Sequence, residues 1–118
     1  MSPKPPEEVE DLLPLTPRVF LILWALADGK RHGYRLLREV EELSRGRVTI
    51  KPGSLYEAIH TLEGRGLIEA TSNDDGGGRQ RRDYRLSALG RQVLNAEAGR
   101  LAELVDDLRA SELIRQPE

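Results

Sequence analysis

Residues 52–68 read PGSLYEAIHTLEGRGLI, and this stretch holds the start of a helix, its end and the beginning of a strand. Proline suits the first position of a helix, where its missing N–H would have no partner. Leu55, Ile59 and Leu62 follow at spacings of four and three, so they share one face. Glycines at 64 and 66 then stop the helix. The stretch predicts a helix with one buried apolar face, followed directly by a strand.

Two further helices are predicted upstream. The first runs from about 17 to 28, with Thr16 as its N-cap and Gly29 at its end, and it is apolar on nearly every side. The second covers 33–46, with one apolar face and Gly46 as the expected C′ residue. A helix with no polar face must be covered on all sides, and a domain of this size covers only one or two. The first helix therefore suggests that a partner subunit supplies the rest.

Downstream, the pattern changes from helix to hairpin and back. The segments 67–72 (LIEATS) and 81–87 (RRDYRLS) are strand candidates that bracket a glycine-rich loop, and the stub 47–50 (RVTI) is a candidate third strand. Ser87 then caps a final helix over 88–112, about 37 Å long at 1.5 Å per residue. Its apolar residues have the spacing of a coiled-coil seam: Leu94, Ala98, Leu101, Val105 and Leu108.

These elements define a mainly α fold with a small β hairpin, namely a winged helix-turn-helix with a long C-terminal dimerisation helix. We expect a disordered N-terminal tail over 1–14, a winged helix-turn-helix DNA-binding domain over 15–86, a dimerisation helix over 87–112 and a flexible tail over 113–118. The first tail is expected because SPKPPEEVED is rich in proline and poor in apolar residues.

Composition limits the classes of function. The chain has 118 residues, a net charge of −2 and no cysteine, which excludes disulfides and thiolate sites. Basic charge gathers in the middle, where residues 29–86 carry twelve basic and nine acidic side chains. The usual nucleotide-binding, hydrolase and zinc-protease motifs are absent and the two histidines are isolated, so we expect no enzyme, metal or cofactor. Without a membrane-spanning run or a signal-peptide pattern, a cytoplasmic protein is expected.

Four pieces of the chain resemble the PadR family of bacterial transcriptional regulators, in the family's order. They are LTPRVFLILWAL (15–26), GKRHGYRLLREVEE (29–42), KPGSLYEAIHTLEGRGLIE (51–69) and RRDYRLSALGRQVL (81–94). The most specific is PGSLYEAIHTLEGRGLI, in which Ile59 stands where the family pattern has leucine. The resemblance implies a homodimeric DNA-binding repressor of the short form, whose C-terminal helix packs against the first helix. It also implies release from DNA by a small aromatic or amphiphilic ligand, as in many members.

The third helix is expected to face the major groove of DNA. Its polar contacts, with the lysine that precedes it, are predicted to be Lys51, Ser54, His60 and Thr61. Tyr56 lies beside the core face, either with its hydroxyl at a phosphate or simply as a half-buried aromatic. Glu57 would be repelled by phosphates unless it accepts a hydrogen bond from a cytosine amine.

Phosphate contacts are also expected from two other places. The second helix of a helix-turn-helix crosses the DNA backbone, so Tyr34 and Arg35 at its start are candidates, although Tyr34 could merely pack and His32 could merely shape the turn. The second place is DDGGGRQRRDYR (74–85). Its glycines permit close approach to DNA and its arginines attract phosphate, and the candidates there are Arg79, Arg81 and Arg82. The alternative is a hairpin whose arginines are only solvated.

The final helix is expected to pair two subunits, and the predicted interface residues are Leu23, Leu94, Ala98, Leu101, Val105 and Leu108. Such a dimer would place its third helices about 34–36 Å apart on palindromic double-stranded DNA. Trp24 either packs in the interface or, with Phe20 and the partner's Leu101 or Leu104, lines a slot for an aromatic effector. A winged helix that binds protein instead of DNA is the alternative function, but it would need an apolar patch on the wing.

Overall fold

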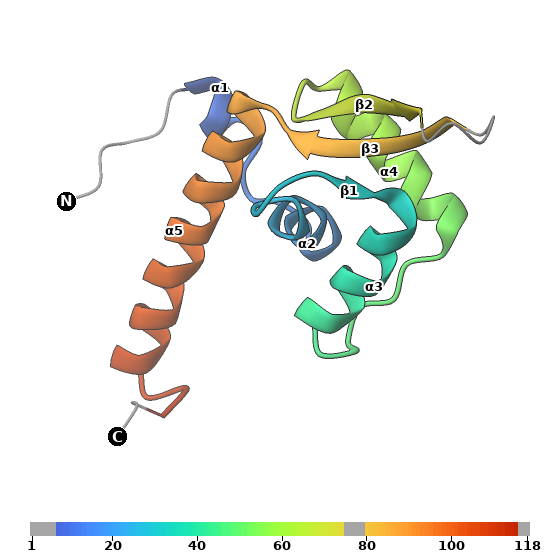
Figure 1. The fold of residues 1–118 in the computed structure, drawn as a ribbon. Coiled ribbons are helices and arrows are strands. Elements are labelled where there is room, and N and C mark those ends of the chain that lie inside the picture. Colours follow the sequence, from blue (N-terminus) through green and yellow to red (C-terminus); the bar gives the residue numbers. More distant parts are fainter. Residues whose placement is uncertain (1–6, 75–79, 116–118) are drawn as a thin grey trace.

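The computed structural model describes residues 7–74 and 80–115 (Figure 1). Its elements are α1 (Glu7–Glu10), α2 (Pro17–Ala25), β1 (Arg31–His32), α3 (Gly33–Leu43), α4 (Pro52–Gly64), β2 (Ile68–Asp74), β3 (Gln80–Leu86) and α5 (Ala88–Ala110). In Figure 1, α2 lies between α5 and α3, and α5 extends beyond the rest of the domain toward the C-terminus. This is the predicted winged helix-turn-helix, with α2, α3 and α4 as its helices and β2–β3 as its wing.

The sheet has three strands in the order β1-β3-β2, with both pairings antiparallel. β2 and β3 pair along their whole lengths, which confirms the predicted hairpin. The third strand is β1 and not the stub 47–50, so that prediction is wrong. The stub forms no strand, and its last residue, Ile50, is buried in the core on the way into α4. Because β1 runs directly into α3, it fixes the start of that helix beside β3.

α2 forms the centre of the core. Its buried side chains pack with apolar residues of α3, α4 and α5, including the predicted apolar face of α4, and the cluster contains Leu21, Ile22, Leu23, Leu36, Val40, Leu55, Ile59, Leu62 and Val93. Trp24 is the one large apolar side chain of α2 that stays exposed, at 44%. The chain's own helices therefore cover most of α2, and the exposed remainder is the face that carries Trp24. α2 also ends at Ala25 and not at 28. The N–H groups of Leu26 and Ala27 donate to carbonyls three residues earlier, instead of the four-residue spacing of an α-helix.

α3 ends in a Schellman motif that is shifted by one residue from the prediction. The N–H of Arg45 donates to the carbonyl of Glu42 (3.1 Å), and the N–H of Gly46 donates to that of Glu41 (2.8 Å). Arg45 is thus the C′ residue, with φ 56°, and Gly46 follows it with φ 78°. The expectation that glycine occupies C′ is wrong here, because arginine takes the left-handed conformation first.

The expectation of a disordered tail over 1–14 is wrong for residues 7–14. Residues 7–10 form α1, which packs against α5 and buries Val9. Residues 1–6 lie outside the described residues. At the other end, 113–115 form neither helix nor strand, and 116–118 are also outside the described residues.

Glu97 on α5 binds the backbone at Leu15, directly after this N-terminal segment. Its side chain is buried, its Oε2 accepts a 2.5 Å hydrogen bond from the N–H of Leu15, and its Oε1 pairs with Arg100. Burial alone would raise the pKa of the carboxyl. The hydrogen bonds from Arg100 and Leu15 and the positive charge of Arg100 outweigh burial and lower the pKa below the ordinary 4.5. The ionised carboxylate is therefore the form that holds the segment.

Glu97→Gln is expected to lower the free energy of unfolding at neutral pH by about 2 kcal/mol, the usual contribution of hydrogen bonds to a charged group. Because the folded-state pKa is lowered, this stabilisation is present above the unfolded-state pKa and is lost as pH falls through the folded value. Urea unfolding should show the difference between wild type and Glu97→Gln shrinking below about pH 4.5. A difference that persists unchanged into acid would contradict the ionised pair.

Candidate nucleic-acid interface

The start of α3 meets the exposed face of α4 at Gly33 and Tyr56. A Cβ atom on Gly33 would lie 2.8 Å from the Tyr56 hydroxyl oxygen and 2.9 Å from a ring carbon. The tyrosine ring therefore lies directly over the first residue of α3, where glycine leaves room for it. Tyr56 nevertheless remains about half exposed. This contact places the first turn of α3 and the outer face of α4 side by side on one surface.

Most of the predicted DNA contacts are exposed in the single chain, namely Tyr34, Arg35, Lys51, Tyr56, His60, Thr61 and Arg82. Tyr34 is the most open of the aromatic ones, at 74%. Tyr56 and His60 are one turn apart on α4, with Thr61 beside them. Ser54 is half-buried. Nothing is described for the side chain of Arg81, and Arg79 lies outside the described residues.

α3 and α4 also differ from the other two long helices at their N-termini. The first turns of α2 and α5 are capped by the side chains of Thr16 and Ser87. The N-cap residues of α3 and α4 are His32 and Lys51, and neither side chain makes a capping hydrogen bond within the described part of the chain. The first N–H groups of α3 and α4 are thus left for another acceptor, and a helix N-terminus favours an anion.

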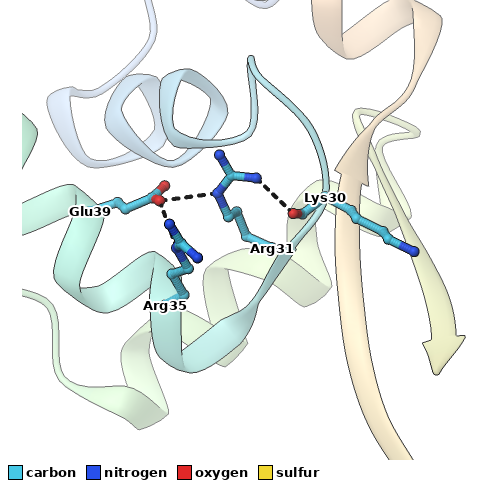
Figure 2. A network of polar contacts seen from close by, with 4 residues as sticks. All are labelled: Lys30, Arg31, Arg35 and Glu39. Carbon is cyan, nitrogen blue, oxygen red and sulfur yellow. Dashed lines mark hydrogen bonds and ion pairs between the residues drawn. The ribbon is translucent and has the colours of Figure 1, made fainter. Parts of the chain in front are cut away.

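A network at the first turns of α3 holds two arginines (Figure 2). Nε of Arg31 lies 3.0 Å from Oε1 of Glu39, and Nε of Arg35 lies 3.1 Å from the same oxygen. Arg31 also donates to the carbonyl of Lys30. Glu39 thus engages only one edge of the Arg35 guanidinium, and that side chain is mostly exposed. The spacing of four between Arg35 and Glu39 could have been read from the sequence, but the part played by Arg31 depends on the tertiary fold.

Sequence reasoning also missed a pair formed by His32 and Asp83. The two residues lie opposite each other in the β1–β3 pairing, and His32 Nδ1 contacts Asp83 Oδ1. Asp83 is buried although it lies in the arginine-rich strand. No pattern in the local sequence predicts this pair, because β1 is only two residues long.

Along the wing, the positive charge is partly paired. Arg82 on β3 is exposed. Arg85 lies 3.0 Å from Glu69 on the neighbouring strand, in an exposed ion pair. Because such pairs are weak and screened by salt, Arg85 stays accessible, but Glu69 lowers the net positive charge of this part of the wing. Arg82 is the third residue of β3. β3 runs toward α5, so its first residues lie on the side of the sheet away from α5 (Figure 1).

The predicted dimer-interface residues divide into two groups. Leu23 and Leu94 are buried in the core of the single chain, so they offer little or no surface to a partner. The remaining predicted positions are at least partly open, and they are Ala98, Leu101, Val105 and Leu108. Leu104, a residue predicted to line the effector slot, is an exposed large apolar residue on the same helix. An apolar stripe therefore continues along the half of α5 that projects from the domain.

Near the predicted effector slot, the rings of Phe20 and Trp24 have centroids 5.9 Å apart. A pocket of about 310 Å³ lies beside Trp24, and its lining is mostly charged: Asp28, Arg31, Glu39 and Glu42, with Ala25 and Leu43. Phe20 does not line it. An aromatic-binding slot of the predicted kind would therefore need apolar side chains from a second chain to complete its lining.

Among residues 7–74 and 80–115, no cluster of histidine and acidic side chains is suited to hold a metal ion. None of the helices described is long and apolar enough to cross a bilayer. The fold and its exposed surface together define a winged-helix protein of the helix-turn-helix class.

Comparison with known proteins identifies the family. The transcriptional regulator PadR-like family matches residues 22–96, more than half of the chain. Transcriptional regulator Rv3488 of Mycobacterium tuberculosis is 37% identical over 87 residues, which cover 74% of this chain and 78% of the relative. An uncharacterized 37.1 kDa protein in transposon TN4556 of Streptomyces fradiae is 40% identical over 84 residues, which cover 71% of this chain but only 23% of that protein. The chain belongs to the PadR-like family, whose members are transcriptional regulators and not enzymes.

Solved structures share the fold. A PadR family transcription regulator from Clostridium difficile aligns with a TM-score of 0.70 at 23% identity, covering 84% of this chain and all of that one. Bacillus subtilis PadR in complex with operator DNA aligns with a TM-score of 0.60 at 21% identity, covering 85% of this chain and 48% of that one.

Proposed function

We propose that the protein is a homodimeric, sequence-specific DNA-binding regulator that represses transcription from a palindromic operator. The observation that carries the proposal is the pair of uncapped helix N-termini, joined through Tyr56 and Gly33, on a surface with exposed Tyr34, Lys51 and His60. Free N–H groups and cations are what a phosphate backbone requires. The structural similarity to a PadR protein that was solved with operator DNA agrees with this function.

The proposed roles follow from position. The outer face of α4 would enter the major groove, where His60 and Thr61 can reach base edges or phosphates. The first turn of α3, with Tyr34 and Arg35, would lie against the backbone, as the second helix of such motifs does. Arg79, Arg81 and Arg82 of the wing would add phosphate contacts at the side.

The dimer is proposed from the open apolar stripe on α5, which includes Leu101, Leu104 and Leu108. A second copy of this stripe is its natural complement, because a two-fold axis places the same surface on both subunits. Trp24 and Phe20 would then lie near the partner's α5 and line a slot for a small aromatic or amphiphilic effector.

A winged helix that binds only proteins is the second candidate. It is less well supported, because the described part of the wing carries Arg82 and an ion pair at its surface instead of an apolar patch. Random duplex DNA at low salt separates the two functions, since phosphate binding does not require the operator sequence.

The combined variant Arg79→Ala, Arg81→Ala and Arg82→Ala tests the wing. We expect it to weaken binding to all DNA sequences, because phosphate contacts carry no sequence information. The slope of log K against log salt should become shallower by about 0.9 for each phosphate that is no longer neutralised, so by about 2.7 for three. Fluorescence anisotropy over a salt series measures the slope. If the slope stays at the wild-type value, these arginines do not contact phosphate.

A further inference from the structure

A hollow of about 400 Å³ lies on the solvent-facing side of α3, within the surface assigned above to DNA. One aromatic, two basic and two acidic side chains line it, and they are Tyr34, Arg35, Arg38, Glu39 and Glu42. Arg35 and Arg38 are three residues apart, so they are neighbours on the helix surface. In the part of the chain that the structure describes, neither Arg38 nor Glu42 takes part in an ion pair.

The charge of this hollow depends on Arg31, which does not line it. A lining of two arginines and two glutamates alone would carry no net charge. Nε of Arg31, on β1, lies 3.0 Å from Oε1 of Glu39, and both side chains are mostly buried, at 22% and 19% exposed. Arg31 also donates to the carbonyl of Lys30, which fixes its guanidinium (Figure 2). Arg31 therefore neutralises Glu39, and only Glu42 opposes the charge of the two arginines in the hollow.

Glu39 also determines which edge of the Arg35 guanidinium is available. Nε of Arg35 donates to Oε1 of Glu39 at 3.1 Å. A guanidinium carries five N–H groups in a planar fork, so the edge with its two terminal amino groups remains for another acceptor. Within residues 7–74 and 80–115 those amino groups make no hydrogen bond, and 66% of the side chain is exposed. This edge can bind a phosphate through two parallel hydrogen bonds.

We propose that Arg35 and Arg38 bind one phosphate of the DNA backbone in this hollow, and that Glu39 is the positioning residue for Arg35. Arg31 supplies the charge that keeps Glu39 from repelling the phosphate. Two neighbouring arginines on a helix repel each other, and a shared anion removes that repulsion. The inference rests on the proposed DNA-binding function, and it adds Arg38 to the phosphate contacts of α3.

Salt titrations of DNA affinity test whether one phosphate is shared. The combined variant Arg35→Gln and Arg38→Gln should make the slope of log K against log salt shallower by about 0.9, because one phosphate is no longer neutralised. Two separate phosphates would change the slope by about 1.8. Arg115→Gln is the control for loss of a positive charge, because Arg115 lies beyond the end of α5. It should keep the wild-type slope.

Two acid substitutions test the role of Glu39. Glu42 lines the same hollow without an arginine partner among the described residues, so Glu42→Gln should bind DNA more tightly than wild type does, because a nearby negative charge is removed. Glu39→Gln should instead bind less tightly, by up to about tenfold, roughly what one hydrogen bond to a charged group contributes. In an Arg35→Gln background this loss should disappear, because there is no guanidinium left to position.

Four outcomes overturn the inference and leave the proposed function in place. The combined arginine variant could keep the wild-type slope, or its slope could become shallower by about 1.8. Glu39→Gln could bind more tightly, as Glu42→Gln does. Glu39→Gln could also lose the same affinity with and without Arg35, which shows only a structural role. If wild type itself fails to bind duplex DNA, the proposed function fails and this inference fails with it.

Nitrogen NMR of the wild-type protein gives a readout that does not depend on how the variants fold. The arginine Nε–H signals are assigned by their absence in Arg35→Gln, Arg38→Gln and Arg115→Gln. Saturating duplex DNA should shift the signals of Arg35 and Arg38 and leave that of Arg115 in place. Signals of Arg35 and Arg38 that do not move on DNA binding would overturn the inference.

Discussion

Gly90→Ala is expected to lower the free energy of unfolding by about 3 kcal/mol, the upper end of the usual cost of overpacking. A Cβ atom at this position would lie 2.0 Å from the carbonyl oxygen of Leu67, an atom of the backbone that cannot rotate away. Around this contact, the Ser87 hydroxyl donates to the carbonyl of Gly66 and the Ser87 N–H to that of Leu67. α5 would have to move away from the turn between α4 and β2, and these hydrogen bonds would break as it moved.

Gly99→Ala is the matched control, because it lies in the same helix and nothing lies within 4 Å of an added Cβ. Alanine favours the helix over glycine by about 1 kcal/mol, so this variant should be slightly more stable than wild type. Urea unfolding at one fixed protein concentration measures both, since dimerisation makes stability depend on concentration. Equal stability of the two variants would show that α5 does not pack so closely on the turn after α4.

Leu104→Glu combined with Leu108→Glu is expected to convert the protein to monomers and to weaken operator binding by at least about 100-fold. Both leucines are exposed in the single chain, so their replacement leaves its core intact. In the proposed dimer, symmetry would place four new carboxylates in one apolar interface, where unpaired charges are costly. Operator binding would fall because linking two binding heads multiplies affinity by about 10² or more.

Gly99→Glu combined with Ala110→Glu is the control for charge. Both residues are exposed, and each lies roughly 140° or more around the helix from the predicted seam position at Leu94 and roughly 120° or more from both replaced leucines. This variant should remain dimeric in sedimentation and bind DNA as wild type does. A Leu104→Glu, Leu108→Glu protein that still sediments as a dimer would contradict the proposed interface.

Planar aromatic compounds should quench Trp24 fluorescence in wild type but not in the monomer, and no quenching in wild type would count against an effector slot there.

The sequence predicts the long elements well, and the reason is physical. α4 and α5 are amphipathic over several turns, so the period of their apolar residues identifies them without any tertiary information. The hairpin follows from two strand-like segments around glycines. The exposure of Tyr34 on α3, and of His60 and Thr61 on α4, can likewise be predicted. The apolar face of each helix packs into the core, and these three residues do not lie on that face.

The missed features all depend on contacts between distant segments. A strand of only two residues, Arg31 and His32, is too short to show an alternating pattern in the sequence. These residues form a strand only because they pair with the edge of β3. α1 is four residues long, and Val9 is buried only because α5 lies beside it. The local sequence likewise does not predict the contact of Gly33 with Tyr56. A glycine at the start of a helix does not by itself indicate that an aromatic ring packs over it.

Selection of bound fragments from random duplex DNA tests the central claim most directly, because it asks at once whether the chain binds DNA, reads sequence and acts as a pair. We predict enrichment of a dyad-symmetric motif whose half-sites are centred about one helical turn apart, roughly 34–36 Å. Failure to retain any duplex at low salt, or retention with no enriched motif, would contradict a dimer that reads an operator with its two α4 helices.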